Sequence, residues 1–471
     1  MTETSTQVGF QSKAPRLGLV PGFDGFRGMG MLMVMLVHAT NTMFEGWSTL
    51  VDCFFVLSGF LITTLLLQEY RSTDGISLRK FYARRAARLF PSVLLFCFVW
   101  LCISTVSTII GFEPLSLGRV AADVGAAVTY TYHVFFPVGL AMIEPAVQNQ
   151  RTMWHLWTLS LEEWFYLVIA GTVLVCVRRR WIRSLGWIMA GTAAAIGICR
   201  LFAITGFAQN DPDMIAGARL IFMQRPDGLM LGVALAVLNA YMDRAFIERH
   251  RGRVLAIAGV AAVVWIVNLN LSNELFEKVG LPFFKYAPTS TSEFAQLGSS
   301  HPVYWFQFGH TVSMWCFAVI TFAMVHYWDW WLSRIWSIKA LQGTGRLSYT
   351  LYIWHGLPFI VILALTGGND ASTPIRLARI PVMFLATFLI AIPVYRYVEM
   401  PALKLKLKYS SESQVLDRRT GKMVDTGAVT GTGTADAGTA DAGTADAGTA
   451  DTGAADTIEP ANGSASTASE S

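Results

Sequence analysis

The sequence predicts an all-α fold, a polytopic bundle of transmembrane helices. Hydrophobic residues make up 53% of the 471-residue chain and charged residues only 14%, whereas about a quarter of the residues in a soluble domain are charged. The apolar residues also gather into runs of roughly 20, the length that a helix needs to cross the hydrocarbon core of a membrane. Composition and run length together indicate a multi-pass protein surrounded by membrane lipids.

The apolar runs predict about ten spans. They cover residues 23–44, 50–69, 89–111, 154–177, 181–205, 216–238, 253–271, 305–327, 347–366 and 376–396. A further apolar stretch, 118–137, contains Arg119, Asp123 and His133. We therefore expect that stretch to form an amphipathic or re-entrant segment on the outer side.

Basic residues in the loops predict the orientation, because cytoplasmic loops carry an excess of Lys and Arg. The excess occurs in loops 71–88, 178–183, 243–253 and 404–408. Loops 112–153, 206–215, 272–304 and 367–375 carry mixed or acidic charge instead. With ten spans, every basic loop lies on one side, so we expect both termini in the cytoplasm.

Three segments follow from this topology. Residues 1–21 form a cytoplasmic N-terminal segment without an evident cleavable signal, and residues 22–402 form the transmembrane domain. Residues 403–471 begin with a basic anchor and continue as a low-complexity tail, in which GTADA-like pentads repeat over 433–457. Such a composition cannot bury apolar surface, so we expect the tail to be disordered.

Charge and cysteine usage narrow the function classes. The net charge of +4 is small and scattered over loops, which gives no reason to invoke nucleic acid. The six cysteines lie in apolar stretches without C-x-x-C spacing, so we expect small buried apolar residues rather than disulfides or a metal site. They are Cys53, Cys97, Cys102, Cys176, Cys199 and Cys316.

The first predicted span carries a cation and an imidazole on one stripe. Arg27 and His38 are eleven positions apart, which in an α-helix is roughly 16 Å along the axis and about 20° around it. Asp24 and Arg27 lie at the cytoplasmic mouth, where interfacial anchoring is a sufficient explanation for them. His38 lies too deep for that explanation, and a buried imidazole needs a partner.

Polar residues also interrupt the second and fourth spans. The Ser58-Gly59 pair is typical of close helix packing, although Ser58 can also donate a hydrogen bond to a substrate. In WHLWTLSLEEWFY, the spacing places His155 and Glu162 on one helix face. The adjacent carboxylates of Glu162 and Glu163 are expensive within a membrane, which favours a functional role.

Two later spans contain further candidates. Arg225 and Asp227 flank Pro226, which predicts a kinked or broken helix of the kind that faces a cavity. In the ninth span, Tyr352 and His355 share one helix stripe with Ser348. That stripe is explained equally well by polar packing between helices.

These stretches together resemble the membrane acyltransferase-3 family, the group of O-antigen, peptidoglycan and antibiotic O-acylases. The resemblance covers about residues 22–401 and is carried by five motifs in order: FDGFRG with Arg-x10-His; FFVLSG at 54–59; RAARLFP at 85–91; WTLSLEEWFY at 157–166; and GRLSYTLYIWH at 345–355. Two features depart from the family. Met400 stands where members commonly carry a basic residue, and no hydrolase-like domain follows the last span, which favours a stand-alone enzyme.

The resemblance implies an O-acyltransferase in the bacterial cell membrane that uses cytoplasmic acyl-CoA, with acetyl-CoA the first candidate, and no bound cofactor. Its acceptor is a hydroxyl of a cell-envelope glycan, glycolipid or other glycosylated metabolite. The catalytic candidates are His38, Glu162 and Ser58. His38 is the general base, oriented by Glu162, or it carries the acyl group. The donor- and substrate-binding candidates are Arg27, Arg84, Arg85, Arg88, Asp24, Glu163, Arg225, Asp227, Tyr352 and His355.

Two other functions stay open on the sequence alone. Buried His and Glu residues also build proton relays, so the chain could be a proton-coupled transporter or exporter of a small solute or a lipid-linked glycan. A scaffold that recruits partners through its repeat tail is the third reading. Paired carboxylates within a membrane span argue against the scaffold.

Overall fold

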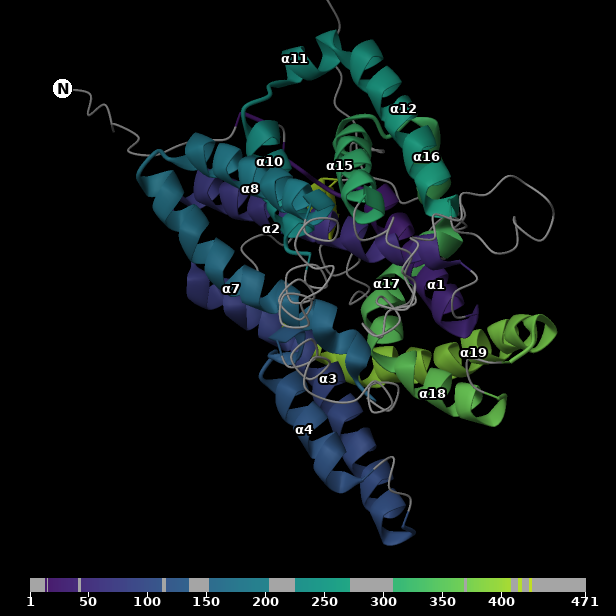
Figure 1. Ribbon diagram of the computed structural model, residues 1–471. Coiled ribbons are helices and arrows are strands. Elements are labelled where there is room, and N and C mark those ends of the chain that lie inside the picture. The colour runs from purple at the N-terminus through teal and green to yellow at the C-terminus, as the bar shows by residue number, and fades with distance from the viewer. Residues whose placement is uncertain are drawn as a thin grey trace, which may run out of the picture. The chain divides into compact units, whose positions relative to one another are not determined.

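The computed structural model describes residues 13–14, 16–40, 44–111, 116–134, 152–202, 225–271, 308–367, 371–407, 414–416 and 423–425. Within the predicted transmembrane domain, these residues are mostly helical (Figure 1). The pentad repeats and most of predicted loops 112–153, 206–215 and 272–304 lie outside the described residues.

The long helices follow the order of the predicted spans. They are α1 (Pro21–Thr40), α2 (Leu50–Thr73), α3 (Leu78–Ile109), α7 (Trp157–Arg178), α8 (Ile182–Phe202), α10 (Asp227–Ala240), α12 (Arg251–Asn270), α15 (His310–His326), α17 (Lys339–Trp354), α18 (Gly356–Leu365) and α19 (Thr373–Val394). Shorter elements join them, namely η2 (Glu45–Thr49), α4 (Leu117–Val128), η4 (Trp154–Leu156), α11 (Arg244–Arg249) and α16 (Trp331–Trp336).

Six described helices are long and apolar enough to cross a membrane, and a bent pair makes a seventh. The six correspond to the predicted spans 50–69, 89–111, 154–177, 181–205, 253–271 and 376–396. The chain is therefore a multi-pass membrane protein. The other three predicted spans are represented by α1, which carries Asp24, Arg27 and His38, and by the shorter α10 and α15. The count of ten stays a prediction.

The predicted span 347–366 is not one continuous helix. The chain bends by 57° between α17 and α18, at His355. Pro358 lies three residues beyond the bend, and a proline lacks the N–H that would bond the carbonyl four residues earlier. The predicted span corresponds to this bent helix pair, and the bend places the His355 side chain at the junction of two helices.

The segment expected at 118–137 contains the short helix α4, which lies beside α3 (Figure 1). Its 12 residues are too few to cross a membrane, in agreement with the expected amphipathic segment. One face is buried against the protein, and it includes Val120, Asp123 and Ala127.

Helical structure continues after α19. After α19, the chain makes a π-helical turn (Tyr395–Glu399) and continues as α20 (Met400–Leu407), past the boundary predicted at 402. Two short strands, β1 (Gln414–Leu416) and β2 (Met423–Asp425), then pair antiparallel. The expected basic anchor followed by a disordered low-complexity tail stays a prediction.

Glycines bring two helix pairs into close contact. α1 lies along α17 (Figure 1), where a Cβ on Gly345 would lie 1.8 Å from the backbone oxygen of Asp24. α2 lies along α10, where a Cβ on Gly59 would lie 2.2 Å from the backbone oxygen of Leu229. Gly59 therefore lies in a close helix contact, as expected, whereas the role of Ser58 stays a prediction. These contacts hold α1, which carries Arg27 and His38, against the helix that carries His355.

Cysteine burial is mixed. All six cysteines are free; Cys53 and Cys97 are buried, but Cys102 and Cys199 are exposed on the protein surface. The expectation that all six are buried is therefore wrong. The physical reason is that an apolar stretch of a membrane helix can face lipid, so a small apolar residue needs no protein neighbour there.

Candidate functional site

Polar side chains among the described helices form three clusters. The histidine cluster is His38, His155 and His355 with Trp154. The carboxylate–arginine cluster is Arg27, Ser58, Arg85, Glu162 and Glu163. The ion network is Asp52, Arg200, Arg225, Asp227 and His310. α1 contributes to the first two clusters, through His38 near its C-terminal end and Arg27 near its N-terminal end.

The histidine cluster is built from ring contacts. The ring of His38 stacks on that of His355, with 5.3 Å between centroids and 20° between planes. Trp154 contacts His38 edge-on at 4.8 Å, and His155 contacts His355 at 4.9 Å. His155 and His355 are buried, whereas His38 is partly exposed. The predicted site residues His38 and His355 are thus neighbours.

Tyr352 fastens this cluster to α7. Its hydroxyl donates to the backbone oxygen of His155. Because that bond uses the only hydroxyl proton of Tyr352, the Thr158 hydroxyl donates to the Tyr352 oxygen, at 2.6 Å. The phenol predicted to bind substrate is therefore engaged by the protein itself, and it fixes the distance between α17 and the start of α7.

In the carboxylate–arginine cluster, the two adjacent glutamates have different partners. Ser58 Oγ donates to Glu162 Oε1 over 3.1 Å. Glu163 Oε1 lies 3.1 Å from Arg85 Nη2, and the Arg85 guanidinium lies 3.7 Å from the centre of the Tyr166 ring. Each carboxylate is thus satisfied by a different helix, Glu162 by α2 and Glu163 by α3.

The arginines near the N-terminal end of α3 are not equivalent. Arg84 Nη2 pairs with Glu69 Oε2 at 3.2 Å, and Arg85 pairs with Glu163. Within the part of the chain that the structure describes, Arg88 forms no ion pair, although it interacts electrostatically with Arg27 and Glu399. Its charge is the least compensated of the three.

Arg27 lies near the N-terminal end of α1, on the side where the donor-binding arginines are expected. Its Nη1 is 3.6 Å from Asp24 Oδ1, a loose pair one helical turn apart. Arg27 also interacts electrostatically with Glu162 and Arg88. The structure therefore brings Arg27 and Arg88 into one electrostatic neighbourhood with Glu162.

His38 and Glu162 belong to different contact networks. Among the described residues, the contacts of His38 are with the rings of Trp154, His355 and Phe359, and Glu162 is hydrogen-bonded to Ser58. A catalytic pairing of His38 with Glu162 stays a prediction. The neighbour that the structure gives His38 is the imidazole of His355.

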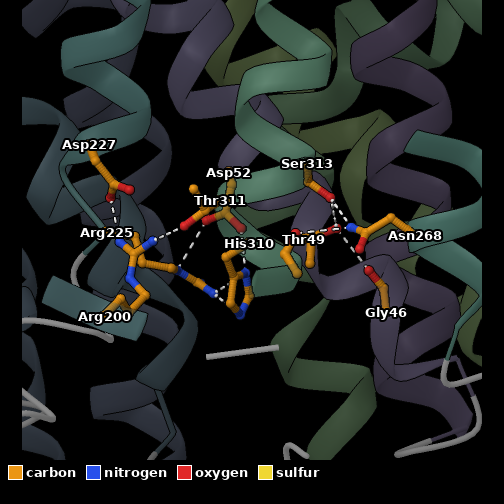
Figure 2. Close-up of polar contacts among 11 residues, drawn as sticks. Gly46, Thr49, Asp52, Arg200, Arg225, Asp227, Asn268, His310, Thr311 and Ser313 are labelled. Atoms are coloured by element: carbon orange, nitrogen blue, oxygen red, sulfur yellow. Dashed lines mark hydrogen bonds and ion pairs between the residues drawn. The ribbon is translucent and has the colours of Figure 1, made fainter. Parts of the chain in front are cut away.

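The ion network was not expected as a unit (Figure 2). Asp52 Oδ1 lies 3.0 Å from Arg225 Nε, and Asp52 Oδ2 lies 2.5 Å from His310 Nδ1. Arg225 Nη1 lies 2.9 Å from His310 Nε2. Asp52 and His310 are each at most 1% exposed as side chains, so this network lies within the protein between α2, α10 and α15.

A second pair extends the network. Arg200, at the end of α8, donates to Asp227 Oδ1 over 2.7 Å and to Thr311 Oγ1 over 2.8 Å (Figure 2). Arg225 precedes α10 with a backbone φ of 39°, in the left-handed region that an L-residue rarely adopts. α10 begins at Asp227, directly after Pro226; the preceding part of the predicted span lies outside the described residues, so the kinked or broken helix stays a prediction. Substrate or donor binding by Arg225 and Asp227 stays a prediction, since both charges are paired within the protein.

Sequence reasoning missed Arg200, His310 and Glu399. The signal was present for the first two, because both stand in apolar runs that were predicted to cross the membrane. Glu399 lies in the π-helical turn, is buried, and accepts a hydrogen bond from the Thr350 hydroxyl on α17. The C-terminal end of the domain, to which the sequence assigned no role, thus contributes a buried carboxylate near Arg88.

The helices and these clusters define a class, a multi-pass membrane protein with histidine, carboxylate and arginine side chains gathered between its helices. Residues 20–396 match the family described as an acyltransferase domain. The chain belongs to this acyltransferase family, and the resemblance noted from the five motifs is confirmed.

Two relatives are similar to most of this chain. The peptidoglycan O-acetyltransferase OatA of Listeria monocytogenes serovar 1/2a is 25% identical over 391 residues, which cover 82% of this chain and 56% of that protein. The O-acetyltransferase OatA of Staphylococcus aureus strain NCTC 8325 is 26% identical over 397 residues, which cover 83% of this chain and 58% of that protein. The chain thus spans somewhat more than half the length of these relatives. No solved structure matches it.

Proposed function

We propose that the protein is an O-acetyltransferase that moves an acetyl group from acetyl-CoA in the cytoplasm to a hydroxyl of a cell-envelope glycan. Membership of the acyltransferase family supports the reaction class. The names of the two relatives, an O-acetyltransferase and a peptidoglycan O-acetyltransferase, support acetyl as the group and a glycan such as peptidoglycan as the acceptor. The direction, from cytoplasm to envelope, rests on the distribution of basic loops.

The observation that carries the proposal is the arrangement of α1. Its N-terminal end brings Arg27 to Arg88 and Glu162, and its C-terminal end brings His38 to His355 and Trp154. The two side chains are roughly 16 Å apart along the helix. One helix therefore joins a cationic end, suited to a nucleotide, to an imidazole end, suited to acyl transfer.

The cationic end suits the donor. Phosphate oxygens form their strongest hydrogen bonds with guanidinium groups. Arg88 and Arg27 offer charge that other side chains compensate incompletely, whereas Arg84 and Arg85 are engaged with glutamates. The phosphates of CoA would then lie near Arg88, and the narrow arm that carries the thioester would run along α1.

The imidazole end suits the transfer step. A sugar hydroxyl is a weak nucleophile until a base removes its proton, and imidazole is the side chain best matched to that task near neutral pH. Three imidazoles meet there. We assign these histidines acid–base work.

A proton-coupled transporter is the second candidate, and the ion network favours it. Paired Asp, Arg and His residues inside a helix bundle are typical of proton relays. The network of Asp52, Arg225 and His310 has that composition. A transporter, however, needs neither acetyl-CoA nor an ester product, so the two functions are separated by the product formed.

The test is acetyl transfer in isolated membranes supplied with acetyl-CoA labelled in the acetyl group. We expect alkali-labile label in the envelope glycan, and a fall of roughly 10²- to 10⁴-fold with His38→Ala. His250→Ala is the matched control, because His250 lies outside the histidine cluster and bonds only locally to Phe246. If the protein is correctly inserted and no labelled hydroxyl ester forms, the enzyme function is contradicted and the transporter function is favoured.

A further inference from the structure

His355 has one ring nitrogen fixed by the backbone and the other without a partner. Its Nδ1 lies 2.6 Å from the backbone oxygen of Tyr352. A carbonyl oxygen only accepts, so Nδ1 carries the proton of the neutral ring and Nε2 carries the lone pair. Within the described part of the chain, that buried Nε2 has no hydrogen-bond partner. A buried polar atom left unpaired is uncommon, and catalysis is one of its known explanations.

His155 has the opposite tautomer and a different surrounding. Its Nε2 lies 3.0 Å from the backbone oxygen of Ile353, so Nε2 carries the proton. Its Nδ1 faces Gly356, where an added Cβ would lie 2.9 Å from that nitrogen and 2.6 Å from Cε1. The His155 ring therefore fills the inside of the bend between α17 and α18, and its lone pair is covered by backbone.

Within the described residues, His155 Nδ1 and His355 Nε2 are thus both buried without a hydrogen-bond partner, and the neighbour of His355 distinguishes its lone pair. The stack on His38 places it beside the imidazole of α1. Among the described contacts of His355, no carboxylate orients the ring; the backbone oxygen of Tyr352 does so. A backbone carbonyl can hold the tautomer of a histidine base as a carboxylate does.

We propose that His355 is the general base of the reaction and that His155 is the residue that positions it. This inference rests on the proposed function. The acceptor hydroxyl gives its proton to His355 Nε2, and its oxygen forms the new C–O bond with the acyl carbon. The C–S bond of the thioester breaks, its electron pair stays on sulfur, and the CoA thiolate takes the proton from His355.

His38 then acts on the donor. An N–H of its ring donates to the thioester carbonyl oxygen, where negative charge develops as the C–O bond forms. The step needs only one positive charge on the stacked pair, on His355, while His38 stays neutral. Two adjacent imidazolium rings would repel each other, so this division of work suits a stacked pair.

The test uses two amide side chains, each of which can replace one ring nitrogen of histidine: asparagine replaces Nδ1 and glutamine replaces Nε2. In His355→Asn, the side-chain N–H can replace Nδ1 and keep the bond to Tyr352, but no base stands at the position of Nε2. Using labelled acetyl-CoA and the envelope glycan of isolated membranes, we expect a fall in kcat of roughly 10²- to 10⁴-fold. The KM for acetyl-CoA should stay within threefold of wild type.

His155 supplies the control that separates positioning from chemistry. His155→Gln keeps an N–H at the position of Nε2 for the Ile353 oxygen, so we expect kcat within tenfold of wild type. His155→Ala loses that bond and should lower kcat further without changing the KM for acetyl-CoA. We therefore expect glutamine to preserve kcat at position 155 and asparagine not to preserve it at position 355.

A kcat of His355→Asn within threefold of wild type overturns the base assignment, because a purely structural His355 is replaced by asparagine. A His155→Gln variant as inactive as His155→Ala overturns the positioning role. If wild-type protein transfers no label, the proposed function fails instead. Acetyl transfer by the wild-type protein therefore distinguishes failure of the proposed function from failure of the His355 assignment.

Discussion

Arg88 differs from its two neighbours on α3 in having no ion pair within the described residues. Arg84 and Arg85 are held by Glu69 and Glu163. Hydrogen bonds to charged groups contribute about 1.5–3 kcal/mol, so Arg88→Ala should raise the KM for acetyl-CoA roughly 10- to 100-fold with kcat near normal. Arg84→Ala is the matched control, with an expected change under threefold. Steady-state kinetics in membranes measure both, and equal effects of the two variants would refute the distinction.

The sequence identified which residues are polar within the membrane, but not how they pair. Glu162 and Glu163 were read as one unit, and the structure turns them toward different helices. Which helix faces which is not encoded locally, because membrane helices pack by shape along their whole length. His38 is the clearest example, since its neighbour His355 lies more than 300 residues away in the chain.

At the scale of elements, the close contact of α2 with α10 can be tested by substitution. A Cβ on Gly232 would lie 2.3 Å from the backbone oxygen of Val56 and 2.6 Å from the nitrogen of Phe60. Gly232→Ala should therefore force the helices apart and lower stability by about 1–3 kcal/mol. Thermal unfolding of the detergent-solubilised protein measures the loss.

Gly259 on α12 is the matched control, because nothing lies within 4 Å of a Cβ placed there. Gly259→Ala should leave stability unchanged or raise it by up to about 1 kcal/mol, since alanine favours helix over glycine. Equal melting temperatures for the two variants would contradict the close approach of α2 to α10.

A pair outside the spans makes stability depend on pH. Arg251 Nη2 lies 2.5 Å from Asp329 Oδ2, and the hydrogen bond from Arg251 lowers the pKa of Asp329 below its usual value of 3.8. A carboxyl whose pKa is lowered by folding stabilises the protein above its unfolded pKa and loses that contribution as the pH falls through its folded pKa. Asp329→Asn should therefore lower the melting temperature at pH 7 but not near pH 2. A difference that persists unchanged at pH 2 speaks against the pair.

Element boundaries were predictable where hydropathy is strong and failed at the bend. Six predicted spans coincide with long apolar helices. The break at His355 escaped prediction although Pro358 was visible, because membrane helices accommodate proline and a proline alone does not reveal a 57° bend. His355 lies at this bend, and its ring stacks on that of His38.

For the whole molecule, the acyltransferase should work without its C-terminal tail. Residues 410–471 follow α20 and include β1 and β2, which pair with each other. The pentads at 433–457 lack apolar residues that could pack on the helices. Deletion of 410–471 should leave acetyl transfer per inserted protein within twofold of wild type. A large loss in a correctly inserted truncation would mean that the acidic repeats reach the donor arginines.

The fold class and the reaction family were predictable from the whole chain, since composition and five ordered motifs reach across it. The ion network was not, because Asp52, Arg225 and His310 come from three helices far apart in the sequence. Such a network is visible only when the helices are assembled.

The central claim is that α1 joins a donor-binding end at Arg27 to a transfer end at His38. The most direct measurement compares the acetyl-transfer kinetics of Arg27→Ala and His38→Ala in the same membranes. The account predicts that Arg27→Ala raises the KM for acetyl-CoA with little change in kcat, whereas His38→Ala lowers kcat at least 100-fold with unchanged binding of CoA. If both variants change the same kinetic parameter, the two ends of α1 do not divide the work and the account is wrong.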